Sequence, residues 1–545
     1  MVHALEREFA RLGLGKLLIT AYTGVAAAPF GGPTLLRLLN MGLQAKAQAH
    51  VRQADQGQAE AARKKFVDEC GHEPTSVGGV VIDEVSFIEL GVFGHLDMEF
   101  RTLLDAVQGE VAAGGMPLLL CGDCHQKPPP GGTPWHQLMV KAKMEEDQNP
   151  QTSGATSAKA RGLTLLQSAR RVVLKRLMRA QGDQTFINFQ LAMRRTDAEQ
   201  PVPEGLLRAL RTVSGADVSR DAAWRFTPVG VLSHVERDAI NHAQMRAFAK
   251  EFDLPLIRWR LELTDDAFSD PAVREALFEN ELNLWGYFVE GAPVHLLETI
   301  KSVRKLVNGS PALLDSLVVT NDADRQLLVA AYAAGYGDGK FVELNAPPEA
   351  VNVVVGGTKD APRLWHEVPL DDLSELLPDY VPGEQVVPLQ VSANKEQAEC
   401  FGIYAAQQGI AQKLGVRQHQ YGFAWALTDF KLQGRTLPKL ILSICKRSRL
   451  PWMTLASFYV LVSRVRELDG LRLLQHDGTG LSAVSQLGTD EYLHGWERGY
   501  DEATGEWDGE RAARAVHALR SKRDVAKRAA HRTEGDRVLV CVCVW

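Results

Sequence analysis

The sequence has little cysteine, no uninterrupted apolar run of membrane length and no excess of positive charge. Seven cysteines among 545 residues form no even, regularly spaced set, which disfavours a secreted disulfide scaffold and favours a reducing compartment. The longest uncharged stretch, residues 17–36, contains two prolines and three glycines, so it does not suit a membrane helix. With 61 Lys and Arg against 67 Asp and Glu, a nucleic-acid surface would have to be a local basic groove.

What the first part of the chain does contain is three short apolar runs, at residues 17–20, 77–82 and 116–121. Helical stretches separate the runs, and this pattern predicts a parallel sheet with crossover helices. The second run is followed by Asp83 and Glu84, and the third by Gly122 and Asp123. Ligands of such sheets bind beyond the carboxyl ends of the strands, so these polar residues mark a candidate site.

An apolar strand that ends in two adjacent acids suits nucleoside-triphosphate hydrolysis. Asp83 can hold magnesium through water, and Glu84 can polarise the attacking water. Taken alone, the pair is a weak signal, because it also occurs by chance. After the third run, Gln126 offers an amide that could reach a γ-phosphate.

The same segment, residues 121–125, matches the C-x-x-C-H pattern of haem attachment. No axial ligand, export signal or second Cys/His pair at metal spacing is evident, so the sequence disfavours haem and zinc.

Two further segments, residues 428–437 and 455–466, lie in the second half of the chain. Arg464 follows directly on an apolar helix, where its guanidinium could point into a cleft and stabilise charge on a γ-phosphoryl group. The alternative is a structural arginine that caps the helix and pairs with an acid such as Asp469.

The order and spacing of these segments resemble the motifs of superfamily 1 DNA helicases, most closely the Pif-type helicases, which are related to RecD-like enzymes. Six motifs match in order: Ia at residues 20–27 with 31–34, II at 82–84, III at 122–129, IV at 174–179, V at 430–436 and VI at 462–466. Residues 307–309 resemble the asparagine-glycine element ahead of the family's small β domain. The resemblance covers roughly residues 1–475.

This resemblance implies an α/β fold with two RecA-like motor domains of the P-loop NTPase type and a small β-rich insertion in the second. We expect the first motor domain at residues 1–160, without its Walker A segment. The second is expected at 161–290 and 416–475, with the insertion at 291–415 and a polar, basic tail at 476–545. The basic stretch 511–532 predicts a solvated helix, with a nucleic-acid contact as the alternative.

The resemblance also implies an ATP-dependent DNA helicase that moves 5′ to 3′ on single-stranded DNA, with ATP and Mg²⁺ as cofactors. The implied catalytic residues are Asp83, which also holds the metal, Glu84, Gln126, Arg179 and Arg464. The implied nucleotide-binding residues are Gly122, Asp123, Gln433 and Gly434. The implied DNA contacts are Thr23, Gly24, Thr34, Lys431 and Thr436.

Implied partners are single-stranded DNA and duplex or fork DNA, with no membrane and a monomer favoured. The implied setting is intracellular: the nucleus or mitochondrion in a eukaryote, otherwise the cytoplasm, with roles in DNA repair, recombination and telomere maintenance.

One element of the family is missing from these residues, the P-loop Gly-x4-Gly-Lys-Ser/Thr, whose backbone N–H groups cradle the phosphates. Gly-Lys occurs at Gly15 and at Gly339, but Leu17 and Phe341 stand where Ser or Thr is required. We expect the sequence to begin just after its P-loop, and we favour a start codon placed too late over a shortened copy. The alternative function is a non-enzymatic remnant that binds single-stranded DNA or a partner; a RecD-like conjugative or repair enzyme is a third.

Smaller departures from the family are Tyr22 in motif Ia and Cys124, His125 and Lys127 in motif III. None of them removes a group that the chemistry needs.

Overall fold

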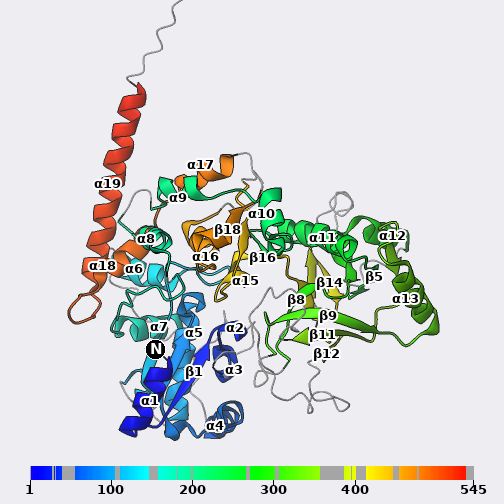
Figure 1. The fold of residues 1–545 in the computed structure, drawn as a ribbon. Helices are drawn as coiled ribbons and strands as arrows, with labels where there is room; N and C mark the ends of the chain where they lie inside the picture. The colour runs from blue at the N-terminus through cyan, green and yellow to red at the C-terminus, as the bar shows by residue number, and fades with distance from the viewer. Residues whose placement is uncertain are drawn as a thin grey trace, which may run out of the picture.

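Two parallel β-sheets and a larger, mainly antiparallel β-rich unit organise the chain in the computed structural model (Figure 1). The structure describes residues 2–27, 30, 32–39, 56–104, 111–146, 158–180, 182–197, 201–264, 271–300, 306–355, 386–394, 396–399, 413–445, 453–474 and 478–535.

The first parallel sheet has the strand order β1–β2–β3. Its strands are β1 (Lys16–Ala21), β2 (Val77–Asp83) and β3 (Leu118–Leu120), so the three strands predicted from the sequence are confirmed. The central strand β2 is buried along most of its length, as expected for a parallel strand covered on both faces. The helices of this part are α1 (Val2–Leu12), α2 (Gly24–Ala27), α3 (Leu35–Leu38), α4 (Gln56–Cys70), α5 (Leu90–Leu103), α6 (Trp135–Glu146) and α7 (Ala158–Gln167).

The second parallel sheet has the order β16–β4–β17–β18. Its strands are β4 (Val229–Val231), β16 (Ala426–Thr428), β17 (Leu440–Leu442) and β18 (Leu471–Leu473). Its helices include α8 (Gln184–Met193), α9 (Glu204–Ala209), α10 (Gly215–Arg220), α15 (Asp429–Leu432) and α16 (Leu455–Val462). Two separate parallel sheets confirm the predicted α/β class.

Between β4 and β16 the chain forms the β-rich unit, which has a five-stranded antiparallel sheet of order β12–β11–β9–β8–β15. These strands are β8 (Pro293–Leu296), β9 (Pro311–Val318), β11 (Ala350–Val355), β12 (Val386–Gln390) and β15 (Tyr421–Phe423). Two three-stranded sheets adjoin it: β10 (Phe341–Glu343) with β5 (Leu256–Arg260) and β7 (Trp285–Phe288), and β13 (Glu396–Glu399) with β14 (Lys413–Arg417) and β6 (Glu262–Leu263). The helices of the unit are α11 (His234–Glu251), α12 (Pro271–Asn280) and α13 (Asp322–Ala334).

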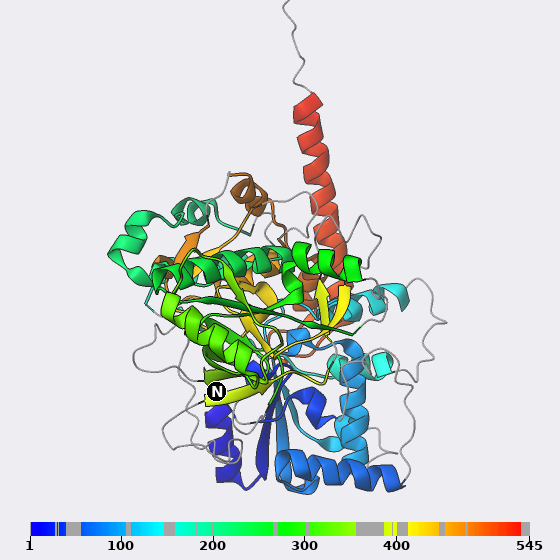
Figure 2. The same ribbon diagram turned by 90° about the vertical axis from the view of Figure 1, so that its right-hand side faces the viewer.

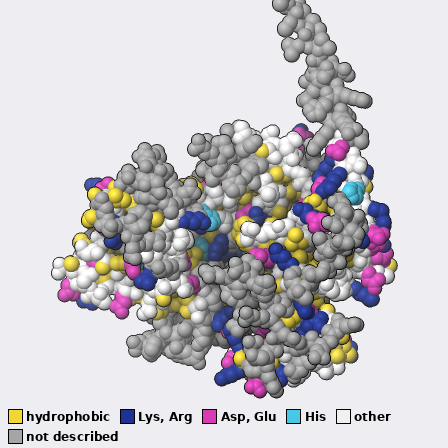
Figure 3. Space-filling model, turned by 180° about the vertical axis from the view of Figure 1, so that it is seen from behind, with side chains coloured by type: hydrophobic (Ala, Val, Ile, Leu, Met, Phe, Trp, Pro, Cys, Tyr) yellow, Lys and Arg dark blue, Asp and Glu magenta, His cyan; other side chains and the backbone are white. Residues whose placement is uncertain are grey.

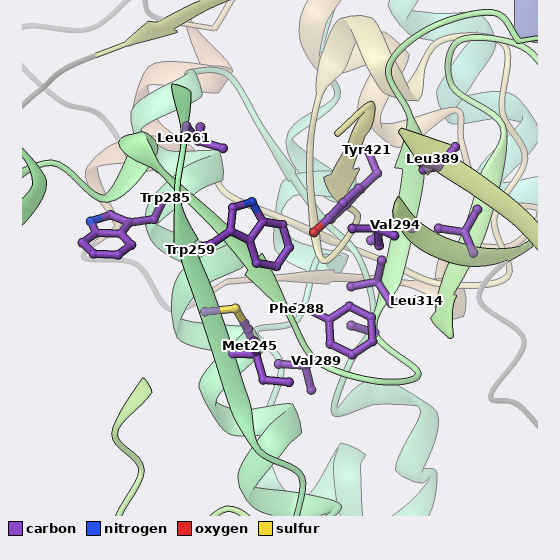
Figure 4. Packing of buried hydrophobic residues seen from close by; sticks show 14 of the residues in the cluster. Met245, Trp259, Leu261, Trp285, Phe288, Val289, Val294, Leu314, Leu389 and Tyr421 are labelled. Atoms are coloured by element: carbon purple, nitrogen blue, oxygen red, sulfur yellow. The ribbon is translucent and has the colours of Figure 1, made fainter. Parts of the chain in front are cut away.

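The buried apolar residues of this unit form one hydrophobic cluster (Figure 4). The cluster includes residues before 291, where the sequence predicted the β-rich insertion to begin. Met245, Trp259 and Trp285 are buried in the same cluster as Leu314 and Leu389. The β-rich unit therefore includes β5 and β7 in addition to strands after residue 291. The domain boundaries themselves stay predictions.

The described C-terminal residues do not form only a polar tail. They form α17 (Thr479–Ser485), α18 (Glu491–Gly499) and α19 (Gly509–Gly535). Helix α17 packs with the second parallel-sheet domain, and α18 and α19 pack onto the helices of the first. Trp496 and Val516 are buried in one cluster with Trp135 and Met139 of α6, and the Trp135 and Trp496 rings meet edge to face at 5.2 Å. Figures 1 and 2 show α19 continuing from this contact as a long projecting helix. Among the described residues, no helix has both the length and the apolar character needed to cross a membrane.

Candidate functional site

Two adjacent acids occupy the carboxyl end of β2. The Asp83 Oδ1 atom accepts a hydrogen bond from the backbone N–H of Glu84 at 2.8 Å. Glu84 has a φ of 55°, a left-handed conformation that non-glycine residues adopt rarely and often at functional turns. Burial raises the pKa of both carboxyls, and for Glu84 a hydrogen bond from Gln433 acts against the effect of burial. A raised pKa makes Glu84 a better proton acceptor for an attacking water.

Motif III lies directly against motif II. The Val85 N–H donates to the Cys121 carbonyl at 3.0 Å, and a Cβ on Gly122 would lie 2.9 Å from the Val85 nitrogen. Burial raises the pKa of the Cys121 thiol to about 11 and also raises that of Cys124, so both thiols serve as packing groups. The side-chain oxygen of Gln126 is buried and has no hydrogen-bond partner in the described part of the chain. Such an orphaned amide is expected where a ligand or water completes the site.

Motif V, from the second sheet, closes onto both motifs through Gln433. Its Nε2 donates to Glu84 Oε2 at 2.8 Å, and its Oε1 accepts from the Lys127 N–H at 3.1 Å. Gly434 has a φ of 80°, and a Cβ there would lie 3.5 Å from Glu84 Oε1. The candidate site therefore lies where the two parallel-sheet domains contact each other, and we call this interdomain contact the cleft.

Asp123 extends the contact between motif III and the second domain. Its Oδ2 accepts from the Tyr459 hydroxyl at 3.0 Å, and its Oδ1 lies 3.5 Å from Arg194 Nη2. All four residues expected to bind nucleotide therefore lie at this interdomain interface: Gly122, Asp123, Gln433 and Gly434.

Arg464 lies at the end of α16 and is 1% exposed. Its guanidinium donates to the carbonyls of Val460 and Arg435 and to the Ser463 hydroxyl. Asp469, the partner proposed by the structural alternative, pairs with other arginines. The helix-capping half of that alternative is correct, since the Val460 carbonyl belongs to the last turn of α16.

Arg179 reaches the same place from the segment before α8. Its Nε donates to the Thr436 hydroxyl at 2.8 Å and its Nη1 to the Ser463 carbonyl at 3.0 Å. Burial lowers the pKa of Arg179, and burial together with the Arg179 charge lowers that of Arg464 to about 9, while the Glu84 carboxylate opposes both shifts. Two like charges held together out of water are typical of a site that stabilises a polyanion.

These residues fit the magnesium and γ-phosphate end of ATP. Asp83 offers the single carboxylate with which a largely hydrated Mg²⁺ is held; no cluster of three or more metal-ligating side chains occurs among the described residues. The P-loop motif Gly-x4-Gly-Lys-Ser/Thr does not occur in these 545 residues. Mg-ATP, when bound, would supply the phosphoryl group and a cation; in the predicted roles, Glu84 would polarise water and Arg179 and Arg464 would offset charge.

Two of the expected DNA contacts, Gly24 and Lys431, meet the asparagine-glycine element, and Thr23 directly precedes Gly24. Lys431 Nζ donates to Asn308 Oδ1 at 2.7 Å. A Cβ on Gly24 would lie 2.8 Å from the Val307 Cβ, and the Thr23 hydroxyl accepts a backbone hydrogen bond at the start of α2. Motif Ia, residues 307–309 and motif V therefore form one continuous surface.

The two other expected contacts have different neighbours. Thr34 stands at the N-cap of α3 without a side-chain capping bond, and it forms an isolated backbone bridge with Ala21. Thr436 is bonded to Arg179 on the nucleotide side of the cleft. Its role in binding DNA stays a prediction.

Sequence reasoning missed Lys127, which it treated as a neutral departure within motif III. Lys127 Nζ lies 2.9 Å from Asp429 Oδ2, donates to the Ser457 hydroxyl at 3.0 Å and lies 4.4 Å from the centre of the Phe430 ring. The Lys127 and Asp429 side chains are 12% and 4% exposed. The only sign of this role in the sequence was that a lysine departs from the family pattern at position 127. In the structure this lysine forms an ion pair between the two parallel-sheet domains.

We expect Lys127→Met to destabilise the protein, because it leaves Asp429 buried without its cation. Losing one partner of a buried pair costs about 3–5 kcal/mol. The double variant Lys127→Met/Asp429→Asn should regain part of this loss, because no charge is then left unpaired. Melting temperatures of the four proteins in this cycle measure the coupling, and a double variant as unstable as the sum of the singles would refute the pair.

His125, the other unusual residue of motif III, contacts the C-terminal helix α18. Its Nε2 lies 3.2 Å from Glu497 Oε1, and Arg171 and Thr196 hydrogen-bond the same carboxylate. Burial alone would raise the pKa of Glu497, but His125 and Arg171 outweigh it and lower that pKa to about 2. Glu497 therefore joins motif III to the segments on either side of α8.

This network predicts a pH-dependent contribution from Glu497. Because its folded pKa lies below the unfolded value of about 4.3, the stabilisation is complete above that pH and is lost as pH falls through about 2. We expect Glu497→Gln to lower stability at pH 7 by roughly 2–3 kcal/mol. The gap in melting temperature to the wild type should close between pH 5 and pH 2. The exposed Glu502→Gln is the control, and a gap independent of pH would contradict the assignment.

Comparison with known proteins gives one consistent family. Residues 10–199 match the family model described as PIF1-like helicase. The ATP-dependent DNA helicase PIF1 of Saccharomyces cerevisiae is 27% identical over 186 residues, which are 33% of this chain and 18% of the yeast protein. That of Danio rerio is 22% identical over 483 residues, which are 87% of this chain and 56% of the fish protein. The chain thus spans about half the length of the fish relative and less of the yeast one.

A solved structure agrees at the level of fold. The Pif1 helicase from Bacteroides, in complex with ADP-AlF3 and single-stranded DNA, matches with a TM-score of 0.50 and 16% identity, covering 90% of this chain and 89% of that one. At this identity the likeness concerns the fold alone, and it agrees with the predicted α/β fold that contains two parallel-sheet domains.

Proposed function

We propose that this chain is the motor portion of an ATP-dependent DNA helicase of the PIF1-like family that moves 5′ to 3′ on single-stranded DNA; the match of residues 10–199 to the PIF1-like helicase model supports the proposal. The observation that carries the proposal is the contact network across the cleft. Gln433 of one domain hydrogen-bonds Glu84 and the Lys127 backbone of the other. Binding or hydrolysis at Glu84 would therefore alter contacts of both domains at the same time. Such a shared contact is needed to couple ATP hydrolysis to domain movement.

Each side chain then has a defined part in this proposal. Asp83 holds magnesium, Glu84 takes up the proton of the attacking water, and Gln126 contacts the γ-phosphate. Arg179 and Arg464 offset the charge that spreads over the phosphoryl oxygens. The surface formed by Thr23, Gly24, residues 307–309 and Lys431 holds the DNA backbone.

The partners in this proposal are single-stranded DNA and duplex or fork DNA, with Mg²⁺ and ATP as cofactors and a monomer as the working unit. In a eukaryote we place the protein in the nucleus or mitochondrion, in repair, recombination and telomere maintenance.

The DNA surface is tested by strand binding, which needs no hydrolysis. We expect the 545-residue protein to bind a single-stranded oligonucleotide largely without sequence preference, with affinity falling as salt rises. Lys431→Ala should weaken binding and reduce the slope against salt concentration by about 0.7, the value for one phosphate contact on a single strand. Lys340→Ala, a lysine 84% exposed on the β-rich unit, is the control. Equal affinity and slope in both variants would refute the surface.

A second function is supported by one observation, the absence of a P-loop from these 545 residues. A protein with this cleft but without the phosphate cradle would bind single-stranded DNA or a partner without turnover. The ATPase experiments in the Discussion separate the two.

A further inference from the structure

Arg435 of motif V is a buried cation to which neither the sequence nor the proposed function gives a role. Its side chain is 7% exposed. Burial lowers its pKa to about 10, so the guanidinium keeps its charge at pH 7. Taking such a group out of water costs free energy that its hydrogen bonds must offset. The groups that Arg435 contacts therefore indicate what it holds in place.

The side chain of Arg435 holds the asparagine-glycine element. Its Nη2 donates to the Gly309 carbonyl at 2.7 Å, which joins motif V to the β-rich unit. Gly309 has a φ of 95°, which favours glycine, and its N–H donates to the Leu296 carbonyl of β8 at 2.7 Å. The adjacent Asn308 accepts from Lys431 Nζ at 2.7 Å. Arg435 thus fixes the backbone directly beside the Lys431 contact of the expected DNA surface.

The first parallel-sheet domain meets the same turn. A Cβ on Gly309 would lie 2.5 Å from Cγ2 of Val25 in α2. In the same way, a Cβ on Gly24 would lie 2.8 Å from the Val307 Cβ. Such short approaches leave no room for a side chain on either glycine. The carbonyl that Arg435 holds therefore lies where motif Ia, motif V and the β-rich unit come together.

The backbone of Arg435 faces the nucleotide side of the cleft. Its carbonyl accepts from Arg464 Nη1 at 3.3 Å, and the Arg464 carbonyl accepts from the Leu437 N–H at 2.8 Å. The hydroxyl of the next residue, Thr436, accepts from Arg179 Nε at 2.8 Å. Arg435 thus bonds Arg464 through its backbone and the 307–309 turn through its side chain.

A direct phosphate contact does not explain Arg435. Cations that bind DNA phosphates are exposed, as are the Lys and Arg side chains that Figure 3 shows beside a hollow on one face of the molecule. The guanidinium of Arg435 is buried, and its Nη2 atom is bonded to a protein carbonyl. Its position fits a residue that orients other groups.

We propose that Arg435 is a positioning residue that holds residues 307–309 in the arrangement that binds single-stranded DNA and links this arrangement to Arg464. A shift of Arg464 toward a γ-phosphate would change its hydrogen bond to the Arg435 carbonyl. The side chain of the same residue would pass that change to the Gly309 carbonyl. Nucleotide and DNA would then alter each other's affinity by the same factor, because coupling between two sites is reciprocal. This inference rests on the proposed function and deepens its DNA surface.

The first test measures binding of a single-stranded oligonucleotide to the 545-residue protein at several salt concentrations. Arg435→Met removes the donor, and an apolar residue of similar volume in place of a buried ion often leaves a protein folded. Arg435→Lys keeps a cation, and Lys431→Ala removes an exposed one. Arg472→Met is the matched control, because Arg472 is also buried and pairs with Asp217 and Asp469. Melting temperatures check that each variant is folded.

We expect Arg435→Met to weaken DNA binding several-fold without changing the slope of log affinity against log salt, because no phosphate contact is removed. Lys431→Ala should reduce that slope by about 0.7. Arg435→Lys should regain part of the affinity, since an ammonium can still donate to one carbonyl. Arg472→Met should bind like the wild type.

Wild-type affinity in folded Arg435→Met would overturn the positioning role and leave the proposed function intact. A slope reduced as in Lys431→Ala would also overturn it, because Arg435 would then contact phosphate itself. If Arg435→Met does not fold, Arg435→Lys decides: wild-type affinity in that variant would contradict the proposal. A wild type that binds no DNA would overturn the DNA surface and this inference together.

The second test measures the link to Arg464 in a protein extended at its N-terminus by a strand and a P-loop. The affinity for single-stranded DNA is compared with and without a bound, non-hydrolysable Mg-ATP analogue. We expect the two affinities of the wild type to differ at least about fivefold, the low end of typical coupling. Arg435→Met should bring this ratio close to one while both ligands still bind, and Arg472→Met should keep it.

A wild-type ratio in folded Arg435→Met would overturn the link, and so would a ratio near one in the wild type. A merely structural role for Arg435 would lower the melting temperature and leave the ratio unchanged. If the extended wild type binds no nucleotide, the proposed function itself fails.

Discussion

Arg464→Ala, made in a form of the protein extended at its N-terminus by a strand and a P-loop, is expected to lower DNA-stimulated ATP turnover by about 10³–10⁵-fold. The reason is that Arg464 and Arg179 both hydrogen-bond Ser463, and the charges of both arginines oppose the effect of burial on the Glu84 pKa, at the place where charge on the phosphoryl group would develop. Arg464→Lys should restore turnover only in part, because an ammonium lacks the planar fork of a guanidinium. Binding of single-stranded DNA should change little.

Because Arg464 also holds two carbonyls and the Ser463 hydroxyl, the alanine variant should lose stability as well. A matched control separates the two effects. Arg472 of β18 is a comparably buried arginine that pairs with Asp217 of α10. Arg472→Ala should lower the melting temperature while turnover per folded molecule stays near the wild-type value. If Arg464→Ala and Arg472→Ala lose turnover equally per folded molecule, Arg464 is structural and its assignment as a residue that stabilises phosphoryl charge fails.

The 545-residue protein by itself should hydrolyse ATP orders of magnitude more slowly than a typical motor. Positioning and electrostatic stabilisation supply most of the rate in phosphoryl transfer, and these residues contain no P-loop lysine, hydroxyl or backbone cradle. The measurement is steady-state ATP hydrolysis with saturating single-stranded DNA. DNA-stimulated turnover above about 1 s⁻¹ would show that another segment replaces the P-loop, and the cleft would need a different account.

Local sequence predicted the parts of the cleft that follow from strand ends. Asp83 and Gly122 come directly after apolar runs, and parallel strands bring their carboxyl ends to one edge of a sheet. That edge is where the structure places both residues, with the Cys121 carbonyl bonded to the Val85 N–H. The order of motifs also placed Gln433 and Arg464 in the opposite wall.

Contacts between segments far apart in the chain could not be predicted from the local sequence. His125 meets Glu497 across 372 positions, and the Lys127 N–H meets Gln433 across 306. Hydrophobic periodicity reports which face of an element is buried, and it carries no information about the partner that buries it.

The C-terminal segment and the start of the β-rich unit were missed for the same reason. In α18 the packing is provided by few apolar residues, Leu493 and Trp496, within a polar sequence that indicated a solvated tail. The strands β5 and β7 follow helix α11, so locally they continue an α/β pattern. Only their shared cluster with later strands assigns them to the β-rich unit.

The most direct test of the motor assignment is ATP hydrolysis by the P-loop-extended protein and its Glu84→Gln variant, measured with and without single-stranded DNA. The substitution keeps the shape of the side chain and its place beside Gln433 and Gly434, and it removes the carboxylate that takes up the proton. The account predicts DNA-stimulated turnover in the extended protein, and loss of that turnover in Glu84→Gln with nucleotide binding retained. Near-full turnover in Glu84→Gln, or no DNA-stimulated turnover in an extended protein that binds nucleotide, would contradict it.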